Sequence, residues 1–122
     1  MQRVILVADD SSTVRKFVSF SLKLHEYEVV TAVDGMDALE KMSQTKIDLA
    51  IVDLNMPNMD GFELINAIRS SEDYDKLPVL ILSSERGEES KARAREVGAN
   101  AYLVKPFDAK MLQYQVVKFL ND

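Results

Sequence analysis

Five polar side chains of types that take part in catalysis or metal binding lie at the ends of separate apolar segments. They are Asp9 and Asp10 after RVILV, Asp53 at the end of DLAIVD, Ser83 at the end of PVLILS, and Lys105 at the end of AYLVK. A carboxylate that ends a buried segment is costly to desolvate unless it has partners or a chemical task. Asp53 therefore requires an explanation, which depends on whether the fold brings the other four residues beside it.

Three carboxylates in one cluster would repel one another, and Lys105 is the only obvious counter-charge in this set. A hard divalent cation would relieve the repulsion, and an incomplete carboxylate set that leaves room for waters is typical of Mg²⁺ rather than Ca²⁺. Such a pocket suits a phosphoryl group, whose oxygens would contact Mg²⁺, the Lys105 ammonium and the Ser83 hydroxyl. Asp53 would then be free to attack phosphorus and form an aspartyl phosphate.

The segments that must position these residues alternate between two patterns. Short β-branched runs, mostly apolar on both faces, are typical of parallel strands covered by helices on both sides, and they occur at residues 3–7, 28–32, 48–53, 78–83 and 101–105. Between them lie helical patterns whose apolar faces we expect to be buried: Val14, Phe17, Val18 and Leu22; Met36, Leu39 and Met42; Leu64, Ile65 and Ile68; Leu112, Val116, Phe119 and Leu120. The segment 88–97 is the weakest predicted helix because it offers only small apolar residues and one valine.

This alternation, with connections too short for antiparallel hairpins, predicts an α/β fold built of right-handed crossovers. Gly98 is placed to end a helix with a positive φ, while Gly35 and Gly61 are predicted to lie in Asp-Gly turns. In such a sheet the carboxyl ends of the strands share one edge, where ligands bind. We therefore expect the five polar residues to converge there.

The length, composition and net charge of the chain limit its possible domain organisation and binding partners. A chain of 122 residues with 47% hydrophobic content and a net charge of −5 fits one domain, residues 1–122, and disfavours direct nucleic-acid binding. Cys is absent, which suits a reducing compartment. No signal pattern and no apolar stretch of membrane-spanning length appears. We expect a cytoplasmic protein without membrane insertion.

The chain resembles the receiver domains of two-component response regulators, most of all the stand-alone chemotaxis CheY-like type. The resemblance covers essentially the whole chain and rests on four motifs in order: the acidic pair DD at 9–10, DLNMPNMDG around Asp53, LILSSE around Ser83, and KPF from Lys105 to Phe107. It implies a doubly wound (βα)5 domain with a five-stranded parallel sheet of order 2-1-3-4-5, helices on both faces and no output domain.

The resemblance also implies roles for individual residues. Asp10 and Asp53 would ligate Mg²⁺ directly, together with the backbone carbonyl of Asn55, and Asp9 would contribute through water. Lys105 would contact the phosphoryl group, and the bond between Lys105 and Pro106 would be cis. The protein would catalyse its own phosphoryl transfer and slow autodephosphorylation rather than act as an enzyme on a separate substrate.

A conformational switch is implied as well. The Ser83 hydroxyl would move toward the phosphoryl group, Tyr102 would turn inward, and the surface of the fourth helix, fifth strand and fifth helix would change. Asn55 and Glu85 occupy the positions that influence phosphoryl lifetime. The donor would be a sensor histidine kinase or a histidine phosphotransfer protein, and the recipient a target protein, for which a flagellar motor switch protein is one candidate. We expect a monomer.

Two other functions stay open. A phosphatase of the haloacid dehalogenase class also uses a strand-end Asp with Mg²⁺, but it needs a carboxylate where this chain has Asn55. A receiver-like docking module that has stopped using phosphate would not require Asp53, Ser83 and Lys105 together. For Asp9 and Asp10 the alternative is helix capping, although the hydroxyl residues at 11–13 are better placed for that.

Overall fold

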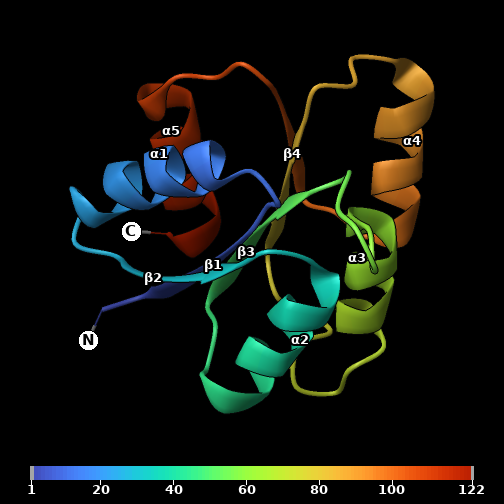
Figure 1. The fold of residues 1–122 in the computed structure, drawn as a ribbon, viewed down its shortest axis with the longest axis horizontal. Coiled ribbons are helices and arrows are strands. Elements are labelled where there is room, and N and C mark those ends of the chain that lie inside the picture. The colour runs from blue at the N-terminus through green and yellow to red at the C-terminus, as the bar shows by residue number, and fades with distance from the viewer. Residues whose placement is uncertain (1, 122) are drawn as a thin grey trace.

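Strands and helices alternate along the chain in the computed structural model, which describes residues 2–121 (Figure 1). The strands are β1 (Val4–Ala8), β2 (Glu28–Ala32), β3 (Leu49–Asp53), β4 (Val79–Ser83) and β5 (Ala101–Val104). The helices are α1 (Ser12–Lys23), α2 (Gly35–Gln44), α3 (Gly61–Arg69), α4 (Glu88–Val97) and α5 (Ala109–Leu120). The ends of the strands differ from the predicted ends by at most one residue.

All strand pairs are parallel, and the sheet order is β2-β1-β3-β4-β5. The predicted fold class is therefore confirmed. The register matters for the site, because Ala8 lies opposite Val52 and Ser83 lies opposite Val104. The residues after Ala8 and Val52, which are Asp9 and Asp53, consequently emerge side by side, and Lys105 emerges next to the end of β4.

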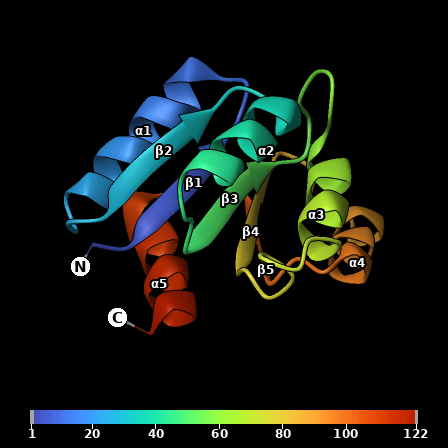
Figure 2. The same ribbon diagram turned by 90° about the horizontal axis from the view of Figure 1, so that it is seen from below.

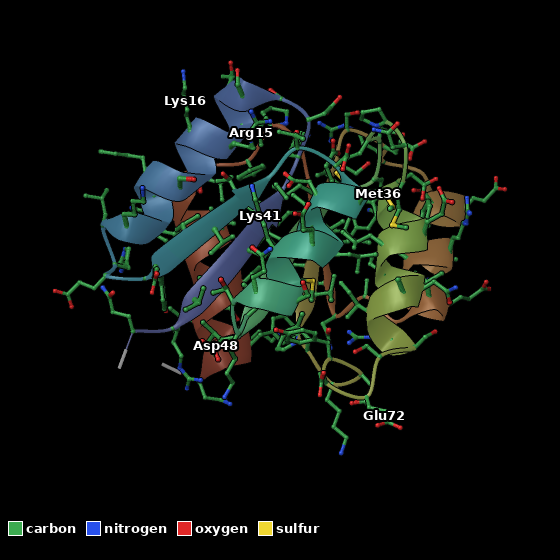
Figure 3. All side chains as sticks on the ribbon, turned by 60° about the horizontal axis from the view of Figure 1, so that its bottom comes forward. Arg15, Lys16, Met36, Lys41, Asp48 and Glu72 are labelled. Carbon is green, nitrogen blue, oxygen red and sulfur yellow. The ribbon has the colours of Figure 1, made fainter. Side chains whose placement is uncertain are left out.

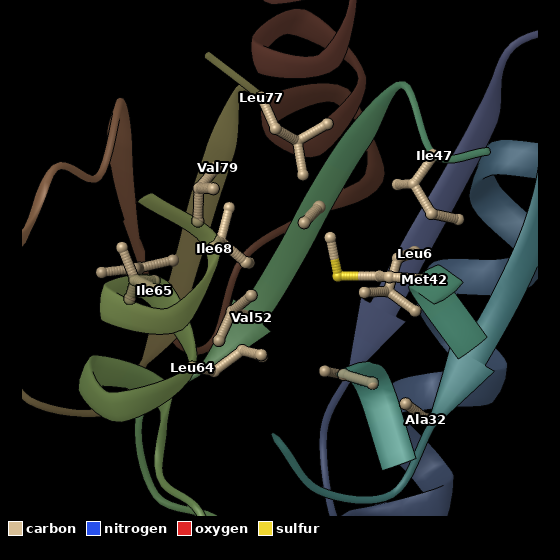
Figure 4. Packing of buried hydrophobic residues seen from close by; sticks show 14 of the residues in the cluster. Leu6, Ala32, Met42, Ile47, Val52, Leu64, Ile65, Ile68, Leu77 and Val79 are labelled. Atoms are coloured by element: carbon tan, nitrogen blue, oxygen red, sulfur yellow. The ribbon is translucent and has the colours of Figure 1, made fainter. Parts of the chain in front are cut away.

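Two layers of helices cover the sheet, with α1 and α5 on one face and α2, α3 and α4 on the other (Figures 1 and 2). Alternate residues of β3 enter the two layers: Leu49 and Ile51 pack beneath α1 and α5, while Ala50 and Val52 pack beneath α2 and α3. Val52 is shown with its neighbours in the second layer in Figure 4. Burial on both faces explains why the strands read as continuous apolar runs. No helix in the described part of the chain is long and apolar enough to cross a bilayer.

Two residues expected to be buried are instead exposed. Phe17 is 42% exposed, because it lies at the edge of the buried face of α1. Its ring contacts that of Phe107 edge-on, with the ring centroids 5.9 Å apart. Met36 is 56% exposed, because it lies on the outer side of the first turn of α2 (Figure 3), whereas Gly35 and Ala38 of the same segment are buried. In both cases buried residues flank the exposed one in the same part of the helix, so helical periodicity overestimated the width of the buried face.

The Asp-Gly pairs form helix starts rather than the predicted turns. Asp34 and Asp60 are the N-caps of α2 and α3 and accept hydrogen bonds from Asp37 N and Glu63 N, so Gly35 and Gly61 are the first helical residues. The correction has a local reason, because an Asp placed just before an apolar-periodic segment satisfies the free N–H groups of the first turn.

The weakest predicted helix, α4, is present. Ala94 is its buried residue, and Gly98 ends the helix with φ 101°, as the sequence predicts. A left-handed conformation at this position is accessible to glycine without steric cost. Few apolar contacts therefore hold α4 against the rest of the molecule.

Gly61 allows α3 to begin directly against the strand end that carries Asp53. A Cβ atom at position 61 would lie 2.5 Å from the carbonyl oxygen of Asp53 and 2.8 Å from Cα of Leu54. Both contacts are with backbone, so a side chain could fit only if the end of β3 or the start of α3 moved. The absence of a side chain at this position thus determines where the Asp53 backbone sits.

Gly61→Ala should lower the free energy of unfolding by about 1–3 kcal/mol, because the added methyl group overpacks a rigid contact. Urea denaturation followed by circular dichroism measures this change. Gly87→Ala is the matched control, since a Cβ at position 87 meets nothing within 4 Å, and it should stay within about 0.5 kcal/mol of the parent protein. Equal effects of the two substitutions would contradict the steric account.

Candidate functional site

The structure brings the polar residues from the strand ends together at the carboxyl edge of the sheet. Carboxylate oxygens of Asp9, Asp10 and Asp53 all lie within 4.8 Å of one another. Lys105 Nζ lies 3.0 Å from Asp9 Oδ2 and 3.4 Å from Asp53 Oδ1. These residues come from three connections far apart in the sequence, and one ammonium group therefore serves two of the three carboxylates.

The three carboxylates differ in their exposure. Asp9 is fully buried and Asp53 is 5% exposed, whereas Asp10 is exposed. Asp9 is held on both oxygens, because Oδ1 accepts a hydrogen bond from Ser11 N at 2.9 Å and Oδ2 accepts one from Lys105. The cluster thus has a closed side at Asp9 and an open side at Asp10, through which solvent or a ligand can reach Asp53.

Burial and the charges of the cluster shift the pKa values of two groups, Asp53 and Lys105. Burial, together with the nearby charge of Asp9, raises the pKa of Asp53 to about 6, against the opposing influence of Lys105. Burial alone would lower the pKa of Lys105, but its hydrogen bond to Asp9 and the charges of Asp53 and Asp9 raise it. At neutral pH Asp53 is therefore mostly ionised and Lys105 is protonated, a combination that favours binding of a cation and a phosphoryl group together.

Ser83 and Tyr102 are linked through a single residue, Glu85. The fully buried Ser83 accepts a hydrogen bond on Oγ from Glu85 N at 3.0 Å. The Tyr102 hydroxyl donates to the carbonyl oxygen of Glu85 at 2.9 Å and lies 3.1 Å from Ser90 Oγ. The hydroxyl end of Tyr102 consequently contacts the β4–α4 connection and the first turn of α4.

The connection after Asp53 is tied to the neighbouring one after β2. Asn58, with φ 67°, donates its side-chain amide to Asp34 Oδ2 at 2.8 Å, and Gly35 N donates to the carbonyl oxygen of Met59 at 3.2 Å. Asn55 is exposed on this connection. The predicted cis bond between Lys105 and Pro106 is present. Sequence reasoning missed the tie between the connections, since it depends on two residues 24 positions apart.

Arg15 is a further residue of the site that sequence reasoning missed. Its Nη1 donates a hydrogen bond to the carbonyl oxygen of Asp9 at 2.7 Å. The available signal was a cation close to the start of a helix, where the helix dipole disfavours positive charge. His25 is exposed in the turn after α1.

Comparison with known proteins agrees with this geometry. Residues 5–117 match the family model of the response regulator receiver domain. Protein PilG of Pseudomonas aeruginosa is 39% identical over 108 residues, which are 88% of this chain and 80% of PilG. The CAI-1 autoinducer sensor kinase/phosphatase CqsS of Vibrio cholerae is 35% identical over 98% of this chain, which spans only 18% of CqsS.

Among solved structures, the chemotaxis protein CheY4 of Vibrio cholerae superposes with a TM-score of 0.94. It is 39% identical, and the match covers 98% of this chain and all of CheY4. The likeness therefore extends over the complete sheet and both helical layers.

Asp53 should make the stability of the protein depend on pH. Its folded pKa of about 6 exceeds the value of about 3.9 for an unfolded chain, so the folded state binds more protons between these values. The stability that this group contributes is full below pH 4 and is lost as pH rises through 6. In metal-free buffer, Asp53→Asn should match the parent protein near pH 4 and become more stable by roughly 2 kcal/mol above pH 6.

Urea denaturation of both proteins at a series of pH values measures this difference. Other ionisable groups are common to the two proteins and largely cancel in the comparison. Two stability curves that run parallel from pH 4 to pH 8 would show that Asp53 is not strained by its neighbours.

Proposed function

Because the chain belongs to the response regulator receiver domain family of two-component systems, we propose that it is a phosphorylation-activated signalling switch with Asp53 as phosphoacceptor. The observation that carries the proposal is the position of Asp53, which ends β3 close to two other carboxylates and to the Lys105 ammonium. The phosphoryl donor is a sensor histidine kinase or a histidine phosphotransfer protein.

The acidic cluster suits Mg²⁺. Asp10 and Asp53 would hold the ion directly with the backbone carbonyl of Asn55, and Asp9 would act through water. Oxygen ligands in an incomplete set, with the exposed side at Asp10 open to solvent, match an ion that keeps several waters. When bound, the ion supplies positive charge that offsets the phosphoryl oxygens.

The transfer step uses the side chains of the cluster. A carboxylate oxygen of Asp53 attacks phosphorus, the bond from phosphorus to the imidazole nitrogen of the donor breaks, and that nitrogen keeps the bonding electron pair; the imidazole leaves neutral because its other ring nitrogen carries a proton. The Lys105 ammonium, 3.4 Å from Asp53 Oδ1, is placed to hold a phosphoryl oxygen. Later attack by water on phosphorus breaks the bond to the Asp53 oxygen, releases inorganic phosphate and returns the free carboxylate, and Asn55 and Glu85 influence the rate of this slow step.

Phosphorylation would act on the contacts of Glu85. If the Ser83 hydroxyl moves to a phosphoryl oxygen, it gives up its bond from Glu85 N, and the neighbouring Tyr102 contact is released so that the ring can turn inward. A new interaction of a few kcal/mol suffices to shift most molecules between two states. The changed surface of α4, β5 and α5 would then bind a target protein, and the likeness to a chemotaxis protein supports a flagellar motor switch protein as one candidate.

The two alternative functions differ in their support. The haloacid dehalogenase alternative loses its basis, because the family model that matches is the receiver domain and position 55 carries no carboxylate. A phosphate-independent docking module would share the family and the fold. The buried positions of Asp9, Asp53 and Ser83 favour the switch, since buried polar groups are costly to keep without a task.

Incubation with Mg²⁺ and acetyl phosphate should add one phosphoryl group, detected by intact-mass spectrometry under neutral conditions. Asp53→Asn should remove the added mass completely, because an amide is not a nucleophile of the required kind. Asp73→Asn is the matched control, since Asp73 is an exposed acid in the α3–β4 connection, and it should be phosphorylated like the parent protein. Phosphorylation of Asp53→Asn to the parental level would overturn the assignment.

Beryllium fluoride with Mg²⁺, a phosphoryl mimic, should shift backbone amide NMR signals well beyond the site. We expect changes in α4, β5 and α5 as well as at Asp53, and no such changes in Asp53→Asn. Changes confined to residues around the acidic cluster would favour the docking module, because a ligand that does not discriminate between two conformations cannot shift their populations.

A further inference from the structure

The contact between Arg15 and the backbone of Asp9 gives Arg15 a role that the proposed switch function does not assign. We propose that Arg15 is a positioning residue that holds the connection between β1 and α1 in the shape required for Asp10 to ligate Mg²⁺. This inference rests on the proposed magnesium site, and it concerns how the site is kept in place rather than which residues form it.

The geometry of α1 directs Arg15 back toward the acidic pair. Side chains on a helix lean toward its N-terminus, so a residue one turn into α1 can reach the segment before the helix. Arg15 Nη1 does so and donates to the Asp9 carbonyl oxygen at 2.7 Å. The neighbouring Lys16 is exposed and points away from the protein (Figure 3), so the two cations differ in their contacts.

The carbonyl group in question belongs to the peptide unit that joins Asp9 to Asp10. Asp9 N donates to the carbonyl oxygen of Ala32 at 3.1 Å, and Ser11 N donates to Asp9 Oδ1 at 2.9 Å. Arg15 adds the contact that sets the plane of the intervening peptide. No hydrogen bond to the Asp10 carboxylate exists within residues 2–121, so its position depends on the backbone that these three contacts hold.

The hydrogen-bond partner of Arg15 indicates that this residue positions the backbone rather than neutralises a carboxylate. An arginine near three carboxylates would be expected to form an ion pair, yet in the described residues the ion pairs to this cluster come from Lys105. Arg15 instead binds a neutral carbonyl. It also sits near the positive end of the α1 dipole, in a helix without an acidic residue in its first turn, where a cation is disfavoured unless a specific contact compensates.

The proposal and simple electrostatics predict opposite changes in Mg²⁺ affinity when Arg15 is replaced. Removing a positive charge beside a cation site should strengthen Mg²⁺ binding if charge alone matters. Losing the contact that orients Asp10 should weaken it, and residues that orient metal ligands typically contribute about tenfold or more to affinity. The direction of the change therefore separates the two explanations.

Mg²⁺ titration followed by amide NMR shifts of residues 9–11 and 53 measures the affinity without any need for phosphorylation. Arg15→Gln, whose shorter side chain cannot reach the carbonyl, should weaken binding by about tenfold. Lys16→Gln removes the same charge from the adjacent position and should bind Mg²⁺ as tightly as the parent protein or more tightly. Arg15→Lys keeps a donor of similar reach and should recover most of the affinity, because one Nη atom makes the contact.

Parental or tighter binding by a folded Arg15→Gln protein would overturn the positioning role and leave the magnesium site intact. Equal losses in Arg15→Gln and Arg15→Lys would also overturn it, because the contact would then not be what matters. Absence of magnesium-dependent shifts in the parent protein would overturn the metal site itself, and this inference with it. If Arg15→Gln does not fold, Arg15→Met, which keeps an apolar stem but has no donor, replaces it: a loss of about tenfold supports the proposal and parental affinity overturns it.

Discussion

Mutual repulsion among the carboxylates of Asp9, Asp10 and Asp53 is the constraint on which the site depends. Negatively charged oxygens within 4.8 Å of one another repel at a partly buried site. The single ammonium of Lys105 offsets only part of this repulsion. The pKa of Asp53 is raised to about 6, first by its burial and then by the charge of Asp9, so part of this repulsion remains in the resting site. A bound cation or the loss of a negative charge would both lower this energy, so the resting site is held in a state that favours its own chemistry.

The fold keeps that unfavourable arrangement from relaxing. The sheet is buried on both faces, so β1 and β3 cannot slide to separate Asp9 from Asp53 without exposing the apolar core. Gly61 brings the start of α3 against the Asp53 carbonyl, and Asn58 ties the following connection to Asp34. The free energy of packing in the two layers thus maintains the proximity of like charges.

Hydrophobic periodicity predicted the strands and their alternation with helices, and the resemblance to receiver domains implied the sheet order. Contacts between distant segments left no periodic signal in the sequence. Apolar runs located the strands, and parallel connections then placed Asp9, Asp53 and Lys105 at one edge. Phe17 and Met36 were misplaced because helical spacing does not report where the core ends. The Arg15 contact could not be deduced, because a cation at that spacing would serve equally well as a surface residue or as an ion-pair partner of the acidic pair.

Glu85 shows how the proposed switch and the phosphoryl lifetime can vary independently. Its backbone N–H contacts Ser83 and its backbone carbonyl contacts Tyr102, so the link between these residues does not require a particular side chain at position 85. The side chain itself, which accepts a weak hydrogen bond from Ser90 at 3.3 Å, is free to differ. Because movement of Ser83 would break a contact made by the backbone N–H of residue 85, it would reach Tyr102 with any residue other than proline at this position. In the proposed function the side chain would separately influence how water approaches the site.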